Sequence, residues 1–401
     1  MFDFGIGPAS GASGASGASG ASGASGASGA SGASGASAGI LATGLGGYDS
    51  PLLTDALTLS RDGIAGPWQA PSAAVQALQE EMPANLERWG AWVRAVVFDF
   101  ELFSRVGFSQ RKDNSMAVWH LHRNDTSDPP SAQYVSLNRF VRPSVPTFAA
   151  QASMVYNYAD LRGDRAAEIQ SELGGGQAFL ASIAYLNPDR TRWTLELLAA
   201  AQRFATFVEM RVKHALACRR TIEYSPQIQP VILTPTHAAL PSGHATETFT
   251  MAVVLWNLLR QPAVPPAVPP PAPAATQYND PLWGLQLMRC AARVAINRIV
   301  AGVHTPVETA AGTLLGLALG NYLVARFRGD TSFQPWFFDG TQYGANEDYD
   351  WTLLYDPAQM AAPTGPPPLP NWAIPDGGVS NVGSASGVLN WLWGKAAVEW
   401  P

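Results

Sequence analysis

Apolar residues recur at every third or fourth position along much of the chain, which is the spacing of helices with one buried face. Residues 74–108 follow this pattern and predict a helix. The face that it predicts to be buried consists of Trp89, Val93, Val96, Phe100 and Phe103. Residues 116–122 alternate instead, which indicates one short strand. Because sustained alternation is almost absent elsewhere, the sequence predicts an all-α protein, a helical bundle with irregular loops.

Helical spacing returns by Asp160, after an irregular stretch punctuated by prolines. Residues 187–189 (Asn-Pro-Asp) predict a turn, with Asp189 as a candidate N-cap. The helical run that follows passes Trp193 and Phe207 and continues toward Arg220. This run matters because it carries the first of three motifs.

Three segments lack a helical pattern. Residues 11–37 are nine copies of Gly-Ala-Ser, which offer no side chain large enough for a core and predict flexible coil, either natural or an engineered spacer. Residues 262–273 are rich in proline and predict an extended surface loop between two helices. From Phe333 onward the sequence predicts a loop-rich tail that wraps over the helical core and is packed by aromatic side chains.

These patterns divide the chain into four parts. A low-complexity segment and linker (1–46) precede an N-terminal helical region (47–200). A helical bundle (201–330) carries the motifs, and an irregular C-terminal wrap (331–401) follows it. With 401 residues, 47% of them hydrophobic, the chain is long enough to bury a full core.

Charge and composition exclude several classes of protein. The net charge of −6 and the absence of a basic stripe argue against a nucleic-acid partner. The longest apolar stretches, residues 249–259 and 310–324, are shorter than the roughly 18–20 residues that cross a bilayer, so no membrane partner is expected. The N-terminus shows no signal peptide, which makes the cytoplasm the default compartment. Cys218 and Cys290 have no metal-ligand spacing and are expected to be buried free thiols.

The first motif is Pro241-Ser242-Gly243-His244, directly before an apolar run that predicts a helix. The first turn of a helix offers free N–H groups and the positive end of the macrodipole, which together suit a tetrahedral oxyanion. Gly243 allows close approach, Ser242 adds a hydroxyl, and His244 can exchange a proton near neutral pH. The alternative is a serine N-cap followed by an incidental histidine.

The second motif is Lys213 and Arg220, seven residues apart and therefore predicted on one face of a helix. Two cations on a helix are usually a solvated surface. Apolar Phe204, Phe207 and Val208 on the same helix indicate instead a buried position, where two like charges need an anion.

The third motif runs from Arg298 to Glu308. Thr305, Pro306 and Glu308 fit the N-cap, first and third positions of a capping box, so His304 is predicted just before a helix start. The alternative for His304 is an ordinary structural histidine.

Together the motifs resemble the superfamily of vanadium haloperoxidases and related PAP2-type acid phosphatases. The family pattern is Lys-x6-Arg-Pro, then Pro-Ser-Gly-His, then Ser-Arg-x5-His-x3-Asp, and the resemblance covers roughly residues 205–320. Seven positions match the anion-contacting residues of the family: Lys213, Arg220, Ser242, Gly243, His244, Arg298 and His304. Three positions depart from it, namely Thr221 for Pro, Asn297 for Ser and Glu308 for Asp. In the family that Asp orients the metal-ligating histidine, so the departure raises the question of whether Glu308 supports His304 or only caps a helix.

The resemblance implies a cofactor and a reaction. Vanadate would be bound through His304, with its oxygens neutralised by Lys213, Arg220 and Arg298 and hydrogen-bonded by Ser242 and Gly243. His244 would take a proton from hydrogen peroxide, and Lys213 would polarise the bound oxygen species. Bromide or iodide would then be oxidised to a hypohalous acid equivalent that halogenates a small organic substrate.

Halide choice depends by resemblance on His237, because members that work best on bromide have histidine there and chloride-oxidising members tend to have phenylalanine. The alternative for His237 is a loop residue without halide contact. Two other functions stay open: a phosphatase with His304 as nucleophile and His244 as leaving-group acid, and an oxyanion-binding protein without turnover. A homo-oligomer, dimeric or larger, also stays open.

Overall fold

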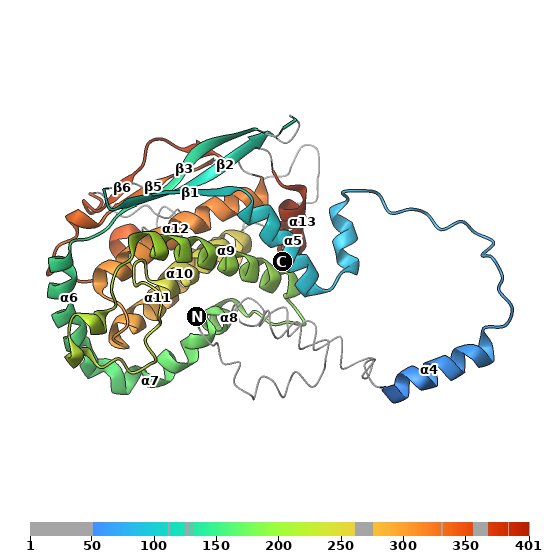
Figure 1. Cartoon of the computed structure of the whole chain (residues 1–401), viewed down its shortest axis with the longest axis horizontal. Helices are drawn as coiled ribbons and strands as arrows, with labels where there is room; N and C mark the ends of the chain where they lie inside the picture. The colour runs from blue at the N-terminus through green and yellow to red at the C-terminus, as the bar shows by residue number, and fades with distance from the viewer. Residues whose placement is uncertain are drawn as a thin grey trace.

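Helices make up most of the protein, and a small sheet covers one side of them (Figure 1). The computed structural model describes residues 51–110, 113–124, 128–129, 131–260, 276–329, 332–355, 368–383 and 385–400. The expectations for residues 11–37 and 262–273 therefore lie outside the described residues.

The α-helices, in chain order, are α4 (Pro51–Ile64), α5 (Ala91–Phe103), α6 (Val145–Asn157), α7 (Arg162–Ser171), α8 (Gln177–Ala184), α9 (Arg192–Leu216), α10 (Gly243–Leu259), α11 (Pro281–Val300), α12 (Pro306–Arg328) and α13 (Gly387–Ala397). The 3-10 helices are η2 (Pro83–Arg88), η3 (Tyr158–Leu161), η4 (Glu172–Gly174), η5 (Thr221–Glu223), η6 (Pro226–Ile228), η7 (Gln277–Asn279), η8 (Gly340–Gln342) and η9 (Trp351–Leu354). The strands are β1 (Val106–Gln110), β2 (Ser115–Asn124), β3 (Ser131–Val141), β4 (Ser332–Phe333), β5 (Trp336–Asp339), β6 (Ala373–Pro375) and β7 (Ser380–Asn381).

The sheet corrects the all-α prediction. Its strand order is β1-β2-β3-β5-β6, and β4 pairs with β7 in a separate two-stranded sheet. The strand predicted over residues 116–122 is present as part of β2. Strand β3 was missed because its inward residues do not alternate cleanly: Leu137, Asn138 and Phe140 are all buried. The C-terminal strand β5 pairs parallel with β3, so the sheet joins the C-terminal region to a strand that precedes the core helices.

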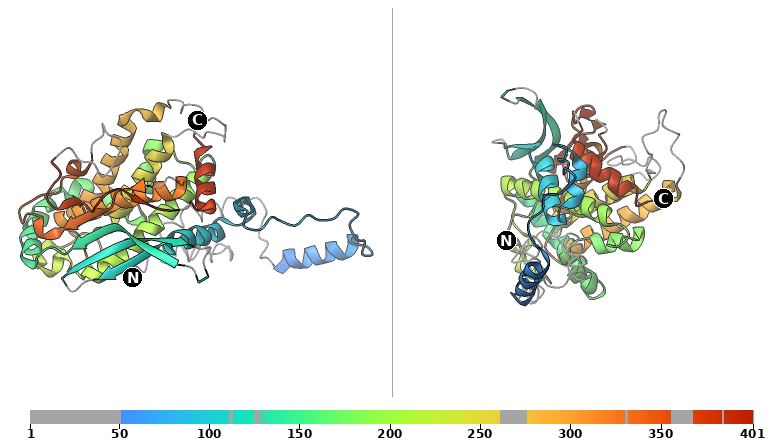
Figure 2. Two further views of the ribbon diagram at one scale, coloured as in Figure 1. Left: turned by 90° about the horizontal axis from the view of Figure 1, so that it is seen from above. Right: turned by 90° about the vertical axis from the view of Figure 1, so that its right-hand side faces the viewer.

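Four long helices form the core. Helix α10 lies among α9, α11 and α12, and the sheet packs against α9 and α12 (Figure 2). Among the described residues, α12 is the one helix long and apolar enough by composition to cross a membrane, and 94% of its most apolar window is buried inside the protein. A buried core helix meets this composition test as readily as a membrane span.

Helix α5 corrects the prediction for residues 74–108. The helix begins only at Ala91, and its buried face consists of Ala91, Arg94, Phe98 and Leu102. Val96 and Phe100, which were predicted to be buried, are 59% and 64% exposed. Periodicity alone selected the wrong face because α5 is apolar on both sides. Arg94 is buried because it forms an ion pair with Glu196.

The C-terminal region is more regular than predicted. It supplies β5, β6 and the three-turn helix α13, which packs on α9 and α12. The expected aromatic packing is confirmed: Trp336, Phe338 and Trp372 are buried. The predicted cap of α9 is wrong, since the N-cap residue is Thr191, and Asn187 instead closes a turn by accepting from the Asp189 N–H at 2.9 Å.

Candidate active site

The buried cations Lys213 and Arg220 come from different elements, which corrects their placement on one helix. Helix α9 ends at Leu216, and Ala217 adopts a left-handed conformation with φ of 49°. The chain therefore turns, and Arg220 lies just before η5. Neither glycine nor proline marks this end, so no stop signal is visible in the sequence. Lys213 and Arg220 are only 1% and 4% exposed, which excludes a solvated surface.

Backbone oxygens hold these two cations in place. Lys213 Nζ donates to the carbonyls of Pro241 and Ala239. Arg220 donates through Nε to the carbonyl of His237 at 2.9 Å and through NH1 to the carbonyl of Val303 at 3.1 Å. Through these hydrogen bonds the two cations hold the loop before α10 close to Val303, the residue before His304. These carbonyls carry only partial charge, so the two positive charges are only partly compensated in the interior.

The N-terminus of α10 faces this point. Ser242 is the N-cap residue, but its side chain makes no capping bond. Its buried Oγ has no hydrogen-bond partner among the described residues. The Ser242 N–H donates to the carbonyl of Glu308 at 2.9 Å, which ties the start of α10 to the first turn of α12. The free hydroxyl and the first N–H groups of α10 are therefore available to an anion.

Gly243 lies close to a carboxyl group of α9. A Cβ at this position would lie 2.6 Å from Oε1 of Glu209, a residue of α9 one turn before Lys213. Glu209 was not singled out from the sequence, although its spacing from Lys213 places both on one face of a helix. Its side chain is buried, and burial holds its pKa well above the ordinary value. The shift favours the neutral carboxyl, which repels an oxyanion less than a carboxylate does.

Glu308 both orients His304 and caps α12. Its Oε2 lies 2.9 Å from His304 Nδ1 and also accepts the Thr305 N–H at 3.0 Å. One oxygen thus serves both purposes, which answers the question raised by the substitution of Glu for Asp. With the Nδ1 proton directed to Glu308, Nε2 carries the lone pair. That nitrogen lies 3.3 Å from Arg220 NH1, at the centre of the buried cations.

Glu172 of η4 connects Arg298 and His244 and was not predicted. Its carboxylate accepts from Arg298 NH2 and from Asn297 Nδ2, while its main-chain oxygen lies 3.1 Å from His244 Nε2. Asn297, where the family has Ser, therefore helps to hold this carboxylate. Local sequence contains no signal for Glu172, because it stands 72 residues before His244.

Arg298 retains unused donors toward the site. It is 1% exposed, and its Nε and NH1 have no partner in the part of the chain that the structure describes.

The remaining departure from the family pattern, Thr221 in place of Pro, also has a structural explanation. The Thr221 hydroxyl donates to the carbonyl of Gly302 and so connects η5 to the loop before His304.

The electrostatics reflect burial and mutual repulsion. Burial lowers the pKa of Lys213 to about 8, with Arg220 adding to the effect and Glu209 opposing it. Burial and then Arg298 lower the pKa of His244 to about 3. His304 is shifted the same way by burial, Arg220 and Lys213, and its pKa lies well below the ordinary value. Burial raises the pKa of Glu308 to about 7, against the Thr305 N–H and Arg220.

His237 lies beside the same cations. Its Nδ1 is 3.0 Å from Arg220 NH2, and burial followed by Lys213 and Arg220 lowers its pKa to about 3. The structure therefore brings all the sequence-predicted site residues to one place: Lys213, Arg220, His237, Ser242, Gly243, His244, Arg298, His304 and Glu308.

The site suits an oxyanion better than a metal cation. Within the described residues, no group of three or more His, Cys, Asp or Glu side chains could hold a metal ion. The free Ser242 hydroxyl and the free Arg298 donors are complementary to anionic oxygens. One neutral histidine nitrogen adds a single ligand or nucleophile. The residue set therefore fits vanadate or phosphate.

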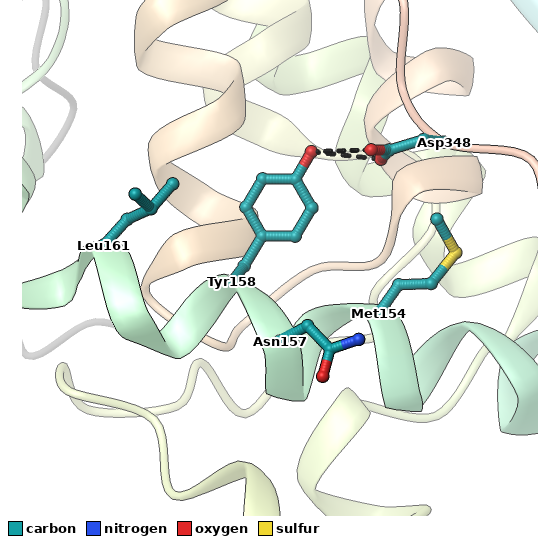
Figure 3. Close-up of a pocket in the computed structure, with 5 residues that line it drawn as sticks. All are labelled: Met154, Asn157, Tyr158, Leu161 and Asp348. Carbon is teal, nitrogen blue, oxygen red and sulfur yellow. Dashed lines mark hydrogen bonds between the residues drawn. The ribbon is translucent and has the colours of Figure 1, made fainter.

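A separate pocket of about 290 Å³ lies between α6, η3 and the C-terminal region (Figure 3). Its lining consists of Met154, Asn157, Tyr158, Leu161 and Asp348, and the Tyr158 hydroxyl donates to the Asp348 carboxylate at 2.9 Å. It contains none of the residues predicted for the active site.

Comparison with known proteins gives a match for the segment that carries the motifs. No curated protein matches the chain. A family model, however, covers the chain from within α9 to just beyond α12, and this span contains all nine residues predicted for the site. Residues 204–331 match the PAP2 superfamily.

Proposed function

We propose that the protein is a vanadium-dependent haloperoxidase that oxidises bromide or iodide with hydrogen peroxide to a hypohalous acid equivalent, which halogenates small organic substrates. The main support is the group of three buried cations near His304 Nε2, which faces Arg220, with unpaired donors on Ser242 and Arg298. Each charge-assisted hydrogen bond to an anion is worth about 1.5–3 kcal/mol, so such a set would hold an oxyanion in a buried site.

Each residue has a defined part in holding vanadate. His304 Nε2 would be the metal ligand, with its tautomer fixed by Glu308. Lys213, Arg220 and Arg298 would neutralise the oxygens, and Ser242 Oγ with the Gly243 N–H would donate hydrogen bonds. When bound, vanadate would supply a Lewis-acidic centre that activates hydrogen peroxide for two-electron oxidation of a halide.

His244 is arranged to accept a proton. Its Nε2 faces the Glu172 carbonyl, an acceptor, so Nε2 carries the hydrogen and Nδ1 carries the lone pair. Its low pKa keeps the ring neutral at pH 7. A neutral imidazole suits deprotonation of hydrogen peroxide, whereas protonation of a leaving group needs the imidazolium form.

The second candidate is a soluble PAP2-type acid phosphatase with His304 as nucleophile. The same geometry supports it, because Nε2 of His304 would attack phosphorus as readily as it would bind vanadium. The superfamily match covers both activities. The observation that favours the peroxidase is the His244 hydrogen bond, because Nε2 donating to the Glu172 carbonyl leaves Nδ1 as a proton acceptor.

The deciding experiment loads the protein with vanadate and measures peroxide-dependent bromination of a phenol dye, alongside hydrolysis of a phosphomonoester. Arg220→Ala should abolish bromination. Arg219→Ala is the matched control, because Arg219 is an exposed neighbour paired with Glu223 and should leave the rate unchanged. Phosphomonoester turnover without any halide oxidation in the vanadate-loaded protein would overturn the proposal. Oxyanion binding with neither activity would indicate a non-catalytic binding protein.

A further inference from the structure

Exposed apolar side chains are concentrated at one end of the molecule. Of the 26 large hydrophobic residues that are exposed in the described chain, twelve lie between residues 52 and 100. They belong to two features: the N-terminal arm, defined as residues 51–82, and the α5 outer face, defined as Trp92, Val96 and Phe100 of α5 together with Trp89 just before the helix. Apolar surface gathered in this way is typical of an interaction site rather than of scattered surface residues.

The N-terminal arm has no support from the rest of the described protein. Every residue of it except Leu53 is exposed, and α4 has no buried residue within the described chain. No helix or strand lies between Ile64 and Pro83. Figures 1 and 2 show α4 held away from the body at the end of this connection. A 14-residue helix is marginal by itself in water, so α4 needs a partner to be stable.

Helix α4 is amphipathic and suits a protein partner. Its apolar side chains share one face by helical spacing: Leu52, Leu53, Ala56, Leu57, Leu59 and Ile64. The opposite face carries Asp55, Asp62 and Arg61, with Arg61 paired to Asp62. Helices that lie on membranes are rich in Lys and Arg on the polar face, and α4 has a single cation.

The α5 outer face is the second exposed apolar surface. Trp92, Val96 and Phe100 recur every four residues and are 49%, 59% and 64% exposed. They lie opposite the buried face of the helix, so α5 carries apolar side chains on two opposite sides. A helix of this kind is typically covered on both of these sides. On this chain one side is exposed.

We infer that two copies of the chain exchange their N-terminal arms, so that α4 of each copy packs on the α5 outer face of the other. One chain offers one arm and one outer face, so a reciprocal two-fold exchange covers both and leaves neither exposed. The arm also leads away from its own α5 (Figure 1). This inference does not depend on the proposed function.

The apolar surface is large enough for a stable dimer. The eight exposed large side chains on α4 and the α5 outer face, at roughly 100 Å² each, amount to about 800 Å² per copy. A standard interface buries about 800 Å² per partner. Trp92 is a residue type that often carries much of the binding energy in such interfaces, and Phe100 is a type enriched in them.

The first test is the mass of the full chain in solution, measured by light scattering and sedimentation. The expected mass is twice the 42.5 kDa of one chain. Phe100→Glu on α5 and Ile64→Glu on the arm should each raise the dimer dissociation constant by at least about tenfold. Leu282→Glu is the matched control, a 54% exposed leucine on α11, and should leave the dimer unchanged. All three positions are exposed, so folding is preserved, which circular dichroism checks.

The second test distinguishes exchange from folding back. Leu59→Cys and Phe100→Cys are introduced in one chain and treated with a short bismaleimide, with the wild type as control for Cys218 and Cys290. Exchange predicts a covalent dimer on a denaturing gel. A cross-link within a single chain would overturn the inference. So would a dimer that survives both glutamate substitutions, or a dimer that gives no cross-link. A monomeric chain would overturn it as well, whether or not that monomer binds lipid vesicles.

Discussion

His304 and His244 have the same side chain but different surroundings, and these surroundings give them different parts in the proposed reaction. His304 Nδ1 is committed to Glu308, which leaves Nε2 facing Arg220. His244 Nε2 is committed to the Glu172 carbonyl, which leaves Nδ1 free. One ring therefore presents a ligand nitrogen, and the other presents a proton acceptor.

Their alanine variants should consequently differ. His304→Ala deletes the protein-to-vanadium bond and is expected to lose most vanadate affinity and all halide oxidation. His244→Ala keeps the cations and that bond, so vanadate should still bind while turnover falls roughly 10²–10⁴-fold. Equilibrium dialysis against vanadate and a bromination assay measure the two effects. Equal vanadate affinity in His304→Ala and the wild type would make His304 a structural residue only.

His237 is the candidate for halide preference. Its ring contacts Arg220, while its carbonyl accepts from Arg220 Nε, so His237→Phe keeps the backbone contact and removes only the ring nitrogen. We expect this variant to lower the bromide-to-chloride rate ratio, because a polar edge beside the cations is replaced by an apolar one. Rates with each halide at saturating peroxide give the ratio. An unchanged ratio assigns His237 to loop structure.

At the scale of elements, the close packing of α10 on α12 aligns the two helix starts that form the site. A Cβ at Gly312 would lie 2.5 Å from the Ser242 carbonyl, and Cβ atoms at Gly316 and Gly320 would meet Thr246 and Val253 of α10 at 2.6 and 2.5 Å. Three glycines one turn apart thus allow the helices to approach along their length. The first of them contacts the N-cap of α10 directly.

Gly312→Ala should therefore weaken both stability and anion binding. The methyl group would meet backbone, which cannot move without shifting the first turn of α10, and overpacking of this kind costs about 1–3 kcal/mol. Gly394→Ala on α13 is the matched control, because nothing lies within 4 Å of its Cβ position. Alanine favours a helix over glycine by about 0.5–1 kcal/mol, so the control should be neutral or stabilising. Denaturant unfolding compares the two variants, and equal stabilities would contradict the packing argument.

The sequence predicted best those features that are encoded within a few residues. The starts of α10 and α12 followed from the Ser-Gly and Thr-Pro-x-Glu signals, and both are present. Features that depend on distant contacts were missed. The end of α9 at Leu216 has no glycine signal, and Glu172 reaches the site only through the fold. The buried face of α5 is set by the Arg94 ion pair with Glu196, which no periodicity contains.

At the scale of the whole molecule, His120 joins the sheet, the helical core and the C-terminal region. Its Nδ1 lies 2.9 Å from the Tyr322 hydroxyl of α12, and its Nε2 lies 2.9 Å from the Val382 carbonyl. Burial and then Arg326 lower its pKa from 6.5 to about 4. Between these pH values the unfolded chain binds a proton that the folded chain does not.

Stability should therefore fall as the pH decreases from 6.5 toward 4, and His120 should account for part of the loss. Above pH 6.5 the His120 ring is neutral in both states and no stability is lost. As the pH falls below 6.5, the loss in the free energy of unfolding grows to at most about 3 kcal/mol. In His120→Gln this titration is absent, so the stability advantage of the wild type over the variant should shrink between pH 7 and pH 4.5. His214→Gln, an exposed position on α9, is the control. Urea unfolding at both pH values measures the difference, and an unchanged difference would contradict the assignment.

The buried cations also predict that an oxyanion stabilises the whole fold. Lys213, Arg220 and Arg298 are buried with incomplete compensation, so a bound anion relieves repulsion in the folded state that the unfolded chain does not experience. Vanadate or phosphate at 100 times its dissociation constant should add about 2.7 kcal/mol to the free energy of unfolding. That gain raises the melting temperature by several degrees. Lys213→Ala should lose most of this shift, whereas Arg219→Ala, whose side chain is exposed, should keep it. Thermal melts with and without the anion measure the shift independently of turnover, and equal shifts in both variants would mean that the anion binds elsewhere.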